Sequence, residues 1–246
     1  MNPHPDDHRL ASAARLLLEG RGEDALGLLF RAWTEEPDNV DMAVSYASTL
    51  AQTGRTQEAE DLFVSLADDC PDDNRIWNNW GYLLLTRGEM ERAIEKFEKA
   101  LVLCPEDFEA MVNTGIALDR LGRSDQSLAF YGKAVELNPD SPVLYNNMGA
   151  AFWRASRADE ALAAFRRALE LNPRDASAAN NMGIIRLAGG DYAEAEGFFR
   201  QALAIDPDSQ AAGKNLAVAQ RQRKQADKDK TAAKDKKCQE KPSSLF

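Results

Sequence analysis

Six prolines divide most of this 246-residue chain into equal segments. They follow one another at intervals of 34 residues without a slip, at Pro37, Pro71, Pro105, Pro139, Pro173 and Pro207. Composition alone does not produce this spacing, because one insertion or deletion in any segment would break it. A fixed period of this length indicates a repeat protein in which each segment is one supersecondary unit.

The segment from Asn74 to Pro105 shows what one unit contains. Its apolar residues recur at spacings of three and four in two runs, Trp77, Trp80, Gly81 and Leu84, then Ala93, Ile94, Phe97, Ala100 and Leu101. This periodicity is typical of two amphipathic helices. The proline at the end of the unit cannot continue the second helix. The predicted fold class is therefore all-α, built from helix-turn-helix units.

Other positions agree in phase with the prolines when Asn74 is counted as position 1 of its unit. Position 8 is small, at Ala13, Ala47, Gly81, Gly115, Gly149 and Gly183, and so is position 20, at Ala25, Ala59, Ala93, Ser127, Ala161 and Ala195. Position 24 is large, at Leu29, Phe63, Phe97, Tyr131, Phe165 and Phe199. We expect the two small positions to admit the large side chain. Stacked units would then share one continuous core.

Between the two helices, position 15 is Gly20, Gly54, Gly88, Gly122, Ser156 and Gly190. Glycine there can adopt the left-handed conformation that ends a helix. Ser141 followed by Pro142 predicts a helix start, with serine as N-cap and proline at the first helical position. Arg186 stands at position 11, where the other units have leucine or phenylalanine. We expect it to lie over a less covered edge.

A 34-residue helix-turn-helix unit with these small and aromatic positions resembles the tetratricopeptide repeat over about residues 6 to 220. The resemblance implies a right-handed superhelical solenoid. The predicted repeats are residues 6–39, 40–73, 74–107, 108–141, 142–175 and 176–209. A short lead, residues 1–5, precedes them. A capping helix, 210–222, and a basic disordered tail, 223–246, follow.

The composition argues against several classes of protein. No run of about 18 apolar residues predicts a membrane span, and the N-terminus lacks the features of a secretory signal, so we expect a cytoplasmic protein. The two histidines, His4 and His8, lie together at the start, and no cluster has metal-ligand spacing. Cys70 and Cys104 fall on equivalent positions of consecutive repeats, which the family geometry would place too far apart for a disulfide.

No residue pattern predicts catalysis. The glycines stand singly, so no phosphate-binding loop is formed, and two histidines at one end allow no nucleophile–base set. We predict a protein that is not an enzyme and that needs no cofactor. Residues 221–246 carry nine Lys or Arg and four Asp or Glu, although the chain has a net charge of −10. The interspersed acids speak against nucleic-acid binding; the tail could instead lie along the acidic body.

Asparagines in the first helix of each repeat are the main candidate site. Position 6 is Asn79, Asn113, Asn147 and Asn181, and position 5 is Asn78, Asn146 and Asn180. Asparagine is a poor residue within a helix, so the repetition requires a reason. The asparagines resemble those of the repeat domain of the O-linked N-acetylglucosamine transferases, where amides in a concave groove hold the backbone of an extended peptide. Hydrogen bonds between neighbouring helices are the alternative.

The resemblance places five further residues in the same groove: Arg75, Tyr82, Arg120, Trp153 and Arg154. Trp153 is the best apolar anchor, because Trp77 and Trp80 fall on packing positions. Tyr82 could belong to either the groove or the core. The arginines could bind acidic side chains or a terminal carboxylate, or remain solvated. No repeat has the Lys and Arg pair with which some family members bind chaperone C-termini, so we do not expect that ligand.

The predicted repeats and their candidate groove lead to two hypotheses about function. The first is a non-catalytic scaffold for protein–protein interaction that binds an extended peptide segment of its partner in the groove. The alternative is a structural or assembly component, of the secretion or pilus type, that acts by oligomerisation. A homo-oligomer could form through an apolar patch in the first repeat, at Leu10, Leu17 and Leu18.

Overall fold

A computed structural model describes the backbone of residues 5–239 and the side chains of residues 8–232. The described residues form helices and contain no strand, so the all-α prediction is confirmed. They fall into two compact units, unit 1 (Met1–Asn138) and unit 2 (Pro139–Phe246).

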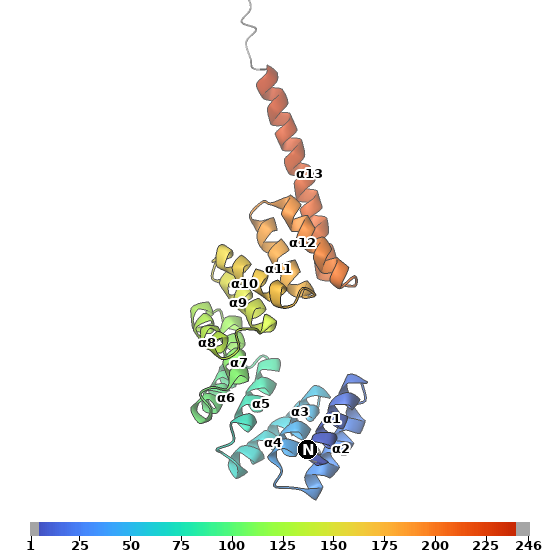
Figure 1. Cartoon of the computed structure of the whole chain (residues 1–246), viewed down its shortest axis with the longest axis vertical. Helices are drawn as coiled ribbons and strands as arrows, with labels where there is room; N and C mark the ends of the chain where they lie inside the picture. Colours follow the sequence, from blue (N-terminus) through green and yellow to red (C-terminus); the bar gives the residue numbers. More distant parts are fainter. Residues whose placement is uncertain (1–4, 240–246) are drawn as a thin grey trace, which may run out of the picture. The chain divides into compact units, whose positions relative to one another are not determined.

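Unit 1 contains the first eight helices (Figure 1). They are α1 (Pro5–Leu18), α2 (Gly22–Glu35), α3 (Val40–Gln52), α4 (Thr56–Asp69), α5 (Asn74–Thr86), α6 (Met90–Leu103), α7 (Phe108–Arg120) and α8 (Ser124–Leu137). Each of the four predicted repeats in this unit holds one helix pair, with α1 beginning one residue early. Residues 1–4 of the predicted lead lie outside the described residues.

Unit 2 contains two further pairs and a long last helix. They are α9 (Pro142–Arg154), α10 (Ala158–Leu171), α11 (Ala176–Ala188), α12 (Tyr192–Ile205) and α13 (Gln210–Gln239). Helix α9 begins where Ser141 and Pro142 predict: the Ser141 hydroxyl accepts a hydrogen bond from the Leu144 amide. Asp73, Asp107 and Asp175, each the last residue of a predicted repeat, cap the first helix of the following repeat in the same way. These caps fix the phase of each helix face.

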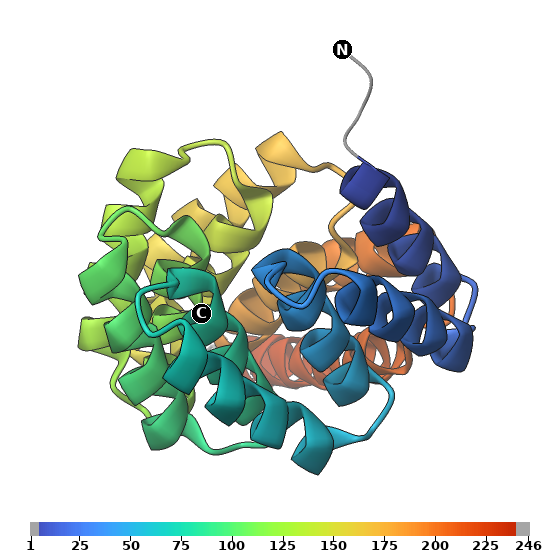
Figure 2. The ribbon, with the colours of Figure 1, turned by 90° about the horizontal axis from the view of Figure 1, so that it is seen from below.

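Within each unit, every helix packs against the next one in sequence. The first helix of each repeat also packs against the first helix of the following repeat, as in α3 with α5, α5 with α7, and α9 with α11. Figure 2 shows the helices of unit 1 following one another in sequence order, from blue to green. Each unit is therefore a solenoid in which contacts run between neighbouring repeats.

The core of each repeat is centred on the large residue at position 24. Phe63, Phe97, Tyr131, Phe165 and Phe199 are among the largest fully buried side chains, each at most 1% exposed. Four of these rings lie directly against the position-8 glycine of the same repeat. The predicted packing of large against small residues is confirmed. Each buried ring contributes roughly 1.5–3 kcal/mol.

The turns between paired helices also follow the sequence prediction. The five glycines at position 15 have φ between 74° and 87°, in the left-handed region. Ser156 occupies the same position of the fifth repeat with φ of 60°. Since a Cβ atom disfavours this conformation, Ser156 is a strained residue in an otherwise regular turn.

Helix α13 differs from the prediction at its C-terminal end. The capping helix was expected over residues 210–222 and disorder from residue 223, whereas α13 continues to Gln239. Residues 221–239 contain no glycine or proline and are rich in alanine, lysine, glutamine and arginine, all favourable in helices. Gln225 and Asp229 add a hydrogen bond of 2.9 Å along the helix. Residues 223–239 therefore have too few apolar side chains to pack against the repeats, but they still form a helix. Residues 240–246 of the predicted tail lie outside the described part.

The first turns of α13 follow the repeat register. Glu196 is 4% exposed and forms ion pairs with Arg200 of its own helix and with Arg223 of α13. Glu60, at the same position of the second repeat, pairs with Arg87 and Arg92 of the third repeat. Arg223 and Arg87 are equivalent positions. Helix α13 thus docks as the first helix of a seventh repeat.

Candidate functional site

The predicted site residues lie on the first helices of repeats three to six, on α5 and α7 in unit 1 and on α9 and α11 in unit 2. We call this surface the A-helix face of each unit. Asn78 is buried, and the other six predicted asparagines are half-buried. Arg75, Arg120 and Arg154 are exposed, and Tyr82 is 52% exposed.

Asparagines at positions 5 and 6 link neighbouring A helices. In unit 1, Asn113 Nδ2 donates to Asn78 Oδ1 at 3.4 Å. In unit 2, Asn181 Nδ2 donates to Asn146 Oδ1 at 3.5 Å. The long distances indicate weak bonds. The alternative role, hydrogen bonding between helices, is therefore present. An amide has two donors and two acceptor lone pairs, so each pair retains capacity for another partner.

Asn79 and Asn147 do not take part in this pairing. Asn79 Oδ1 accepts from the Ser48 hydroxyl at 3.2 Å, and its Nδ2 donates to the Arg75 carbonyl at 2.9 Å. Asn147 makes no side-chain hydrogen bond among the described residues. Its half-buried amide is the one member of the predicted set with full hydrogen-bonding capacity within unit 2.

Asn215 extends the pattern and was missed by the sequence reasoning. It lies on α13, and its Nδ2 donates to Asn180 Oδ1 at 3.0 Å, the shortest of the three amide–amide bonds. The signal was present in the sequence, because Asn215 stands 34 residues after Asn181. The segment from Asp208 resembles the first helix of a seventh unit, so the repeat register places Asn215 at position 6.

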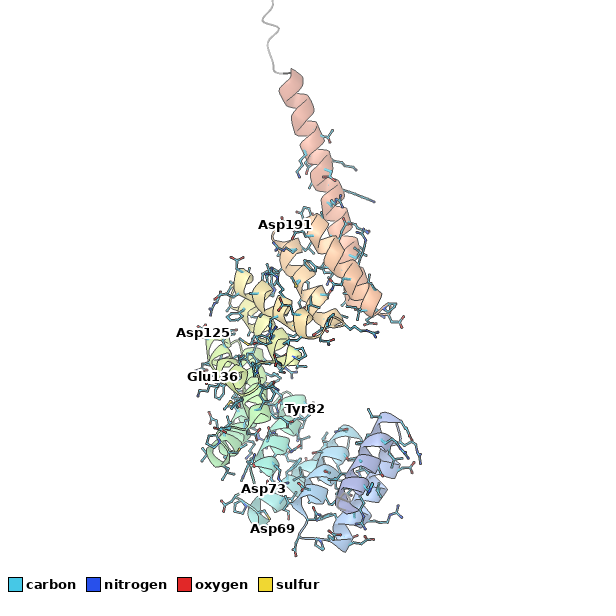
Figure 3. All side chains as sticks on the ribbon, viewed as in Figure 1. Asp69, Asp73, Tyr82, Asp125, Glu136 and Asp191 are labelled. Carbon is cyan, nitrogen blue, oxygen red and sulfur yellow. The ribbon has the colours of Figure 1, made fainter. Side chains whose placement is uncertain are left out.

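Two hollows flank Tyr82 on the A-helix face of unit 1. Tyr82 projects from α5 (Figure 3). The first hollow, of about 330 Å³, is lined by Ser48, Ala51, Gln52, Phe63, Asn79, Tyr82, Leu83 and Thr86. The second, of about 320 Å³, is lined by Asn78, Asn79, Tyr82, Phe108, Glu109, Val112 and Asn113. Each hollow combines apolar walls with amide groups, which is the mixture that binding sites use.

The arginine candidates are less available than the sequence suggested. Arg75 pairs with Asp73 at 2.6 Å and also with Asp41. The hydrogen bond from Arg75 lowers the pKa of Asp73, against the opposing effect of its partial burial. Arg120 Nη1 donates to the Leu85 carbonyl at 3.3 Å. These contacts tie Arg75 and Arg120 to their own unit.

Trp77 and Trp80 belong to the core, whereas Trp153 is only partly buried. Trp77 and Trp80 are each 8% exposed and stack with ring centroids 5.8 Å apart, so their predicted core role is confirmed. Trp153 is half-buried and packs against the core cluster of unit 2 that contains Leu162 and Phe165. Part of the proposed anchor therefore contributes to stability rather than to a free surface.

A further expectation concerns a single position. Arg186 has a side chain 30% exposed and pairs with Glu194 at 3.0 Å, whereas Leu84 at the same position is fully buried.

The apolar patch predicted in the first repeat consists of Leu10, Leu17 and Leu18. Leu10 and Leu17 are half-buried against the local core, and Leu18 is the strongly exposed one of the three, at 90%. The predicted apolar patch is therefore smaller than three leucines.

Within the described part of the chain, no group of histidine, cysteine, aspartate and glutamate residues could hold a metal ion. None of the described helices has the length and apolar composition needed to cross a bilayer.

Comparison with known sequences decides the family. Sequence models of the tetratricopeptide repeat match residues 16–78, 78–142 and 146–210. The chain belongs to the tetratricopeptide-repeat family. Tetratricopeptide-repeat proteins are generally non-catalytic and serve as scaffolds for protein–protein interaction. No curated protein sequence matches this chain.

Solved structures support the same tetratricopeptide-repeat fold. YrrB, described as having an unusual peptide-binding site, is 22% identical with a TM-score of 0.59, covering 75% of this chain and 95% of that one. The Pseudomonas aeruginosa protein pilF is 18% identical with a TM-score of 0.70, and the match covers 86% of this chain and 96% of pilF. A chain of the APC/C hetero-tetramer Cut9–Hcn1 is 18% identical with a TM-score of 0.75, and the match covers 89% of this chain and 44% of that one. These identities establish fold similarity alone.

Proposed function

We propose that this protein is a non-catalytic scaffold that binds an extended segment of a partner protein on its A-helix face. The observation that carries the proposal is the pair of hollows on either side of Tyr82, bordered by Asn78, Asn79 and Asn113. Amides can match the donors and acceptors of an extended backbone whatever its sequence. The hollows offer room for side chains. YrrB, with the same fold, is described as having an unusual peptide-binding site.

The free energy of binding requires both the amides and the hollows of this surface. A hydrogen bond contributes a net of about 0.5–1.5 kcal/mol, and several asparagines already bond to one another. Amides alone therefore fall short of the roughly 8 kcal/mol that a micromolar complex needs. Side chains buried in the hollows would supply the remainder, at roughly 1.5–3 kcal/mol for each large apolar group.

The test uses a peptide selected against the full-length protein from a random library of extended segments. We expect Asn79→Ala with Asn113→Ala, and separately Tyr82→Ala, each to weaken its binding at least about tenfold, or about 1.4 kcal/mol, because these three residues line the hollows of unit 1. Asn172→Ala is the matched control, because Asn172 is the exposed C-cap residue of α10. Circular dichroism must show that the variants remain folded. Unchanged affinity in both folded variants would refute the proposal.

The assembly alternative makes a different prediction. If the chain acts by oligomerising through its first repeat, Leu18→Glu should convert an oligomer into a monomer, since Leu18 is the exposed member of that patch. Light scattering of the full chain measures this directly. A strict monomer at high concentration eliminates the alternative and leaves peptide binding unaffected.

A further inference from the structure

A second apolar surface of unit 1 lies on α6, the second helix of the third repeat. Val102 is 81% exposed, and Leu103 beside it is 38% exposed. Val102 lines two separate hollows. The first, of about 630 Å³, is also lined by Pro71, Trp77, Glu95, Glu98, Lys99 and Leu103. The second, of about 440 Å³, is also lined by Glu98, Leu101, Pro105, Met111, Phe130 and Lys133. We call Val102 and these two hollows the α6 ridge.

The basic and the acidic side chains around the α6 ridge differ in their contacts. Lys99 Nζ lies 4.2 Å from the ring centroid of Trp77, and Lys133 Nζ lies 5.6 Å from that of Phe130. Both lysines therefore rest on aromatic rings, an arrangement that stabilises an ammonium group. Glu95 and Glu98 line the larger hollow, and among the described residues neither forms a hydrogen bond or an ion pair. The ridge thus presents apolar walls beside two carboxylates that form no hydrogen bond or ion pair among the described residues.

We propose that the α6 ridge docks an amphipathic helix of a partner protein, with apolar side chains on one face and Lys or Arg beside them. Two apolar side chains about one turn apart would occupy the hollows on either side of Val102. The basic groups would meet Glu95 and Glu98, which is the charge complementarity that selects partners and steers their approach. This surface is centred on a second helix of a repeat, and its two hollows share no lining residue with the hollows beside Tyr82.

The linings favour a helix over an extended segment. An extended segment carries unpaired backbone N–H and C=O groups that need partners when buried. The hollows offer charged side chains at their rims but no amide such as those on the A-helix face. A helix satisfies its own backbone and needs only apolar contact and charge at its edges.

The experiment measures the binding of a designed peptide to the full-length protein by fluorescence anisotropy. The probe is a helical peptide of about 18 residues, long enough to form a stable helix, with leucines on one face and lysines along both edges of that face. A counterpart carries glutamates in place of the lysines. We expect the leucine–lysine peptide to bind and the leucine–glutamate peptide to bind at least about tenfold more weakly.

Val102→Asp separates docking from simple charge attraction. It adds a negative charge, so general attraction of a cationic peptide would increase, whereas docking on the ridge requires a loss of at least about tenfold. Val64→Asp on α4 is the matched control, because Val64 is also an exposed valine of unit 1, at 43%. Glu95→Lys with Glu98→Lys should reverse the preference between the two peptides. The proposal is overturned if Val102→Asp and Val64→Asp have equal effects, or if the preference does not reverse.

Discussion

The ring of Phe97 lies so close to the backbone of Gly81 that a Cβ atom on Gly81 would come within 2.6 Å of ring atom Cε1. Tyr131, Phe165 and Phe199 stand in the same relation to the position-8 glycines of their repeats. In the second repeat, Ala47 and Phe63 occupy these positions, both fully buried. The glycine therefore determines how closely α5 and α6 approach, rather than whether a helix pair can form.

Gly81→Ala should accordingly destabilise the protein. The added methyl group must displace a fully buried ring, and overpacking of this kind costs typically 1–3 kcal/mol. Urea denaturation followed by circular dichroism measures the change. Gly132→Ala is the control: Gly132 is an exposed glycine within α8, and its Cβ would meet open space. That substitution should stabilise by about 0.5–1 kcal/mol through helix propensity, so equal signs for the two variants would contradict this account.

Ser156→Gly should stabilise the protein. Ser156 is the described non-glycine residue with positive φ, at 60°, and glycine adopts this conformation without the steric cost of a Cβ atom. Relief of about 1–2 kcal/mol of steric cost is offset by about 0.5–1 kcal/mol for the greater backbone entropy of glycine. We therefore expect a net gain of about 0.5–1 kcal/mol in the free energy of unfolding. The reverse change at the equivalent turn, Gly122→Ser, should lower it by a similar amount. If Ser156→Gly were destabilising, the hydroxyl would have to provide a contact that outweighs the strain.

Much of the fold could be predicted from the sequence, because one period repeats the same physical requirements. Pro139 and Gly149, for example, obey the same rules as Pro105 and Gly115, so any single unit specifies the others. The end of α13 could not be predicted in this way. Beyond the repeats, helix propensity favours a helix, whereas low hydrophobicity and dense charge favour disorder, and the predicted tail followed the second indication.

The candidate site was predicted less completely. Periodicity places Asn113 and Asn181 at the same position of their repeats, but it does not say whether each amide faces a ligand or a neighbouring helix. The structure pairs each with an asparagine of the preceding repeat. Arg75 has the same ambiguity, since its partner Asp41 lies one repeat earlier. Contacts between repeats depend on rotamers, which single-sequence patterns do not encode.

Glu60 should make stability depend on pH in the acid range. Burial alone would raise the pKa of Glu60, but hydrogen bonds from Arg92 and Arg87 outweigh burial and lower the pKa. A lowered folded-state pKa means that the stabilisation is fully present above the unfolded-state pKa of about 4.3 and is lost as pH falls through the folded-state pKa. Glu60→Gln should therefore cost about 1–3 kcal/mol near pH 7.

Urea denaturation of the wild type and Glu60→Gln across the acid range measures this dependence. The difference between the two proteins should shrink below about pH 4, where the wild-type carboxylate also becomes neutral. Glu58→Gln is the matched control, because Glu58 pairs with Arg55 on the surface of the same helix. It should have a smaller effect at every pH. A difference for Glu60→Gln that did not vary with pH would exclude the ion pairs as its cause.

Asn215→Ala should loosen α13 at its docked end. The side chain donates to Asn180 Oδ1 at 3.0 Å across the last repeat interface, and its loss leaves a half-buried acceptor without that donor. We expect a cost of about 0.5–1.5 kcal/mol and faster amide hydrogen exchange in residues 210–220, measured by mass spectrometry. Gln225→Ala, further along α13, removes a hydrogen bond to Asp229 that lies on the exposed part of the helix. Exchange in residues 210–220 should not respond to that control, because the early turns dock through Ala212 and Ala219, both fully buried.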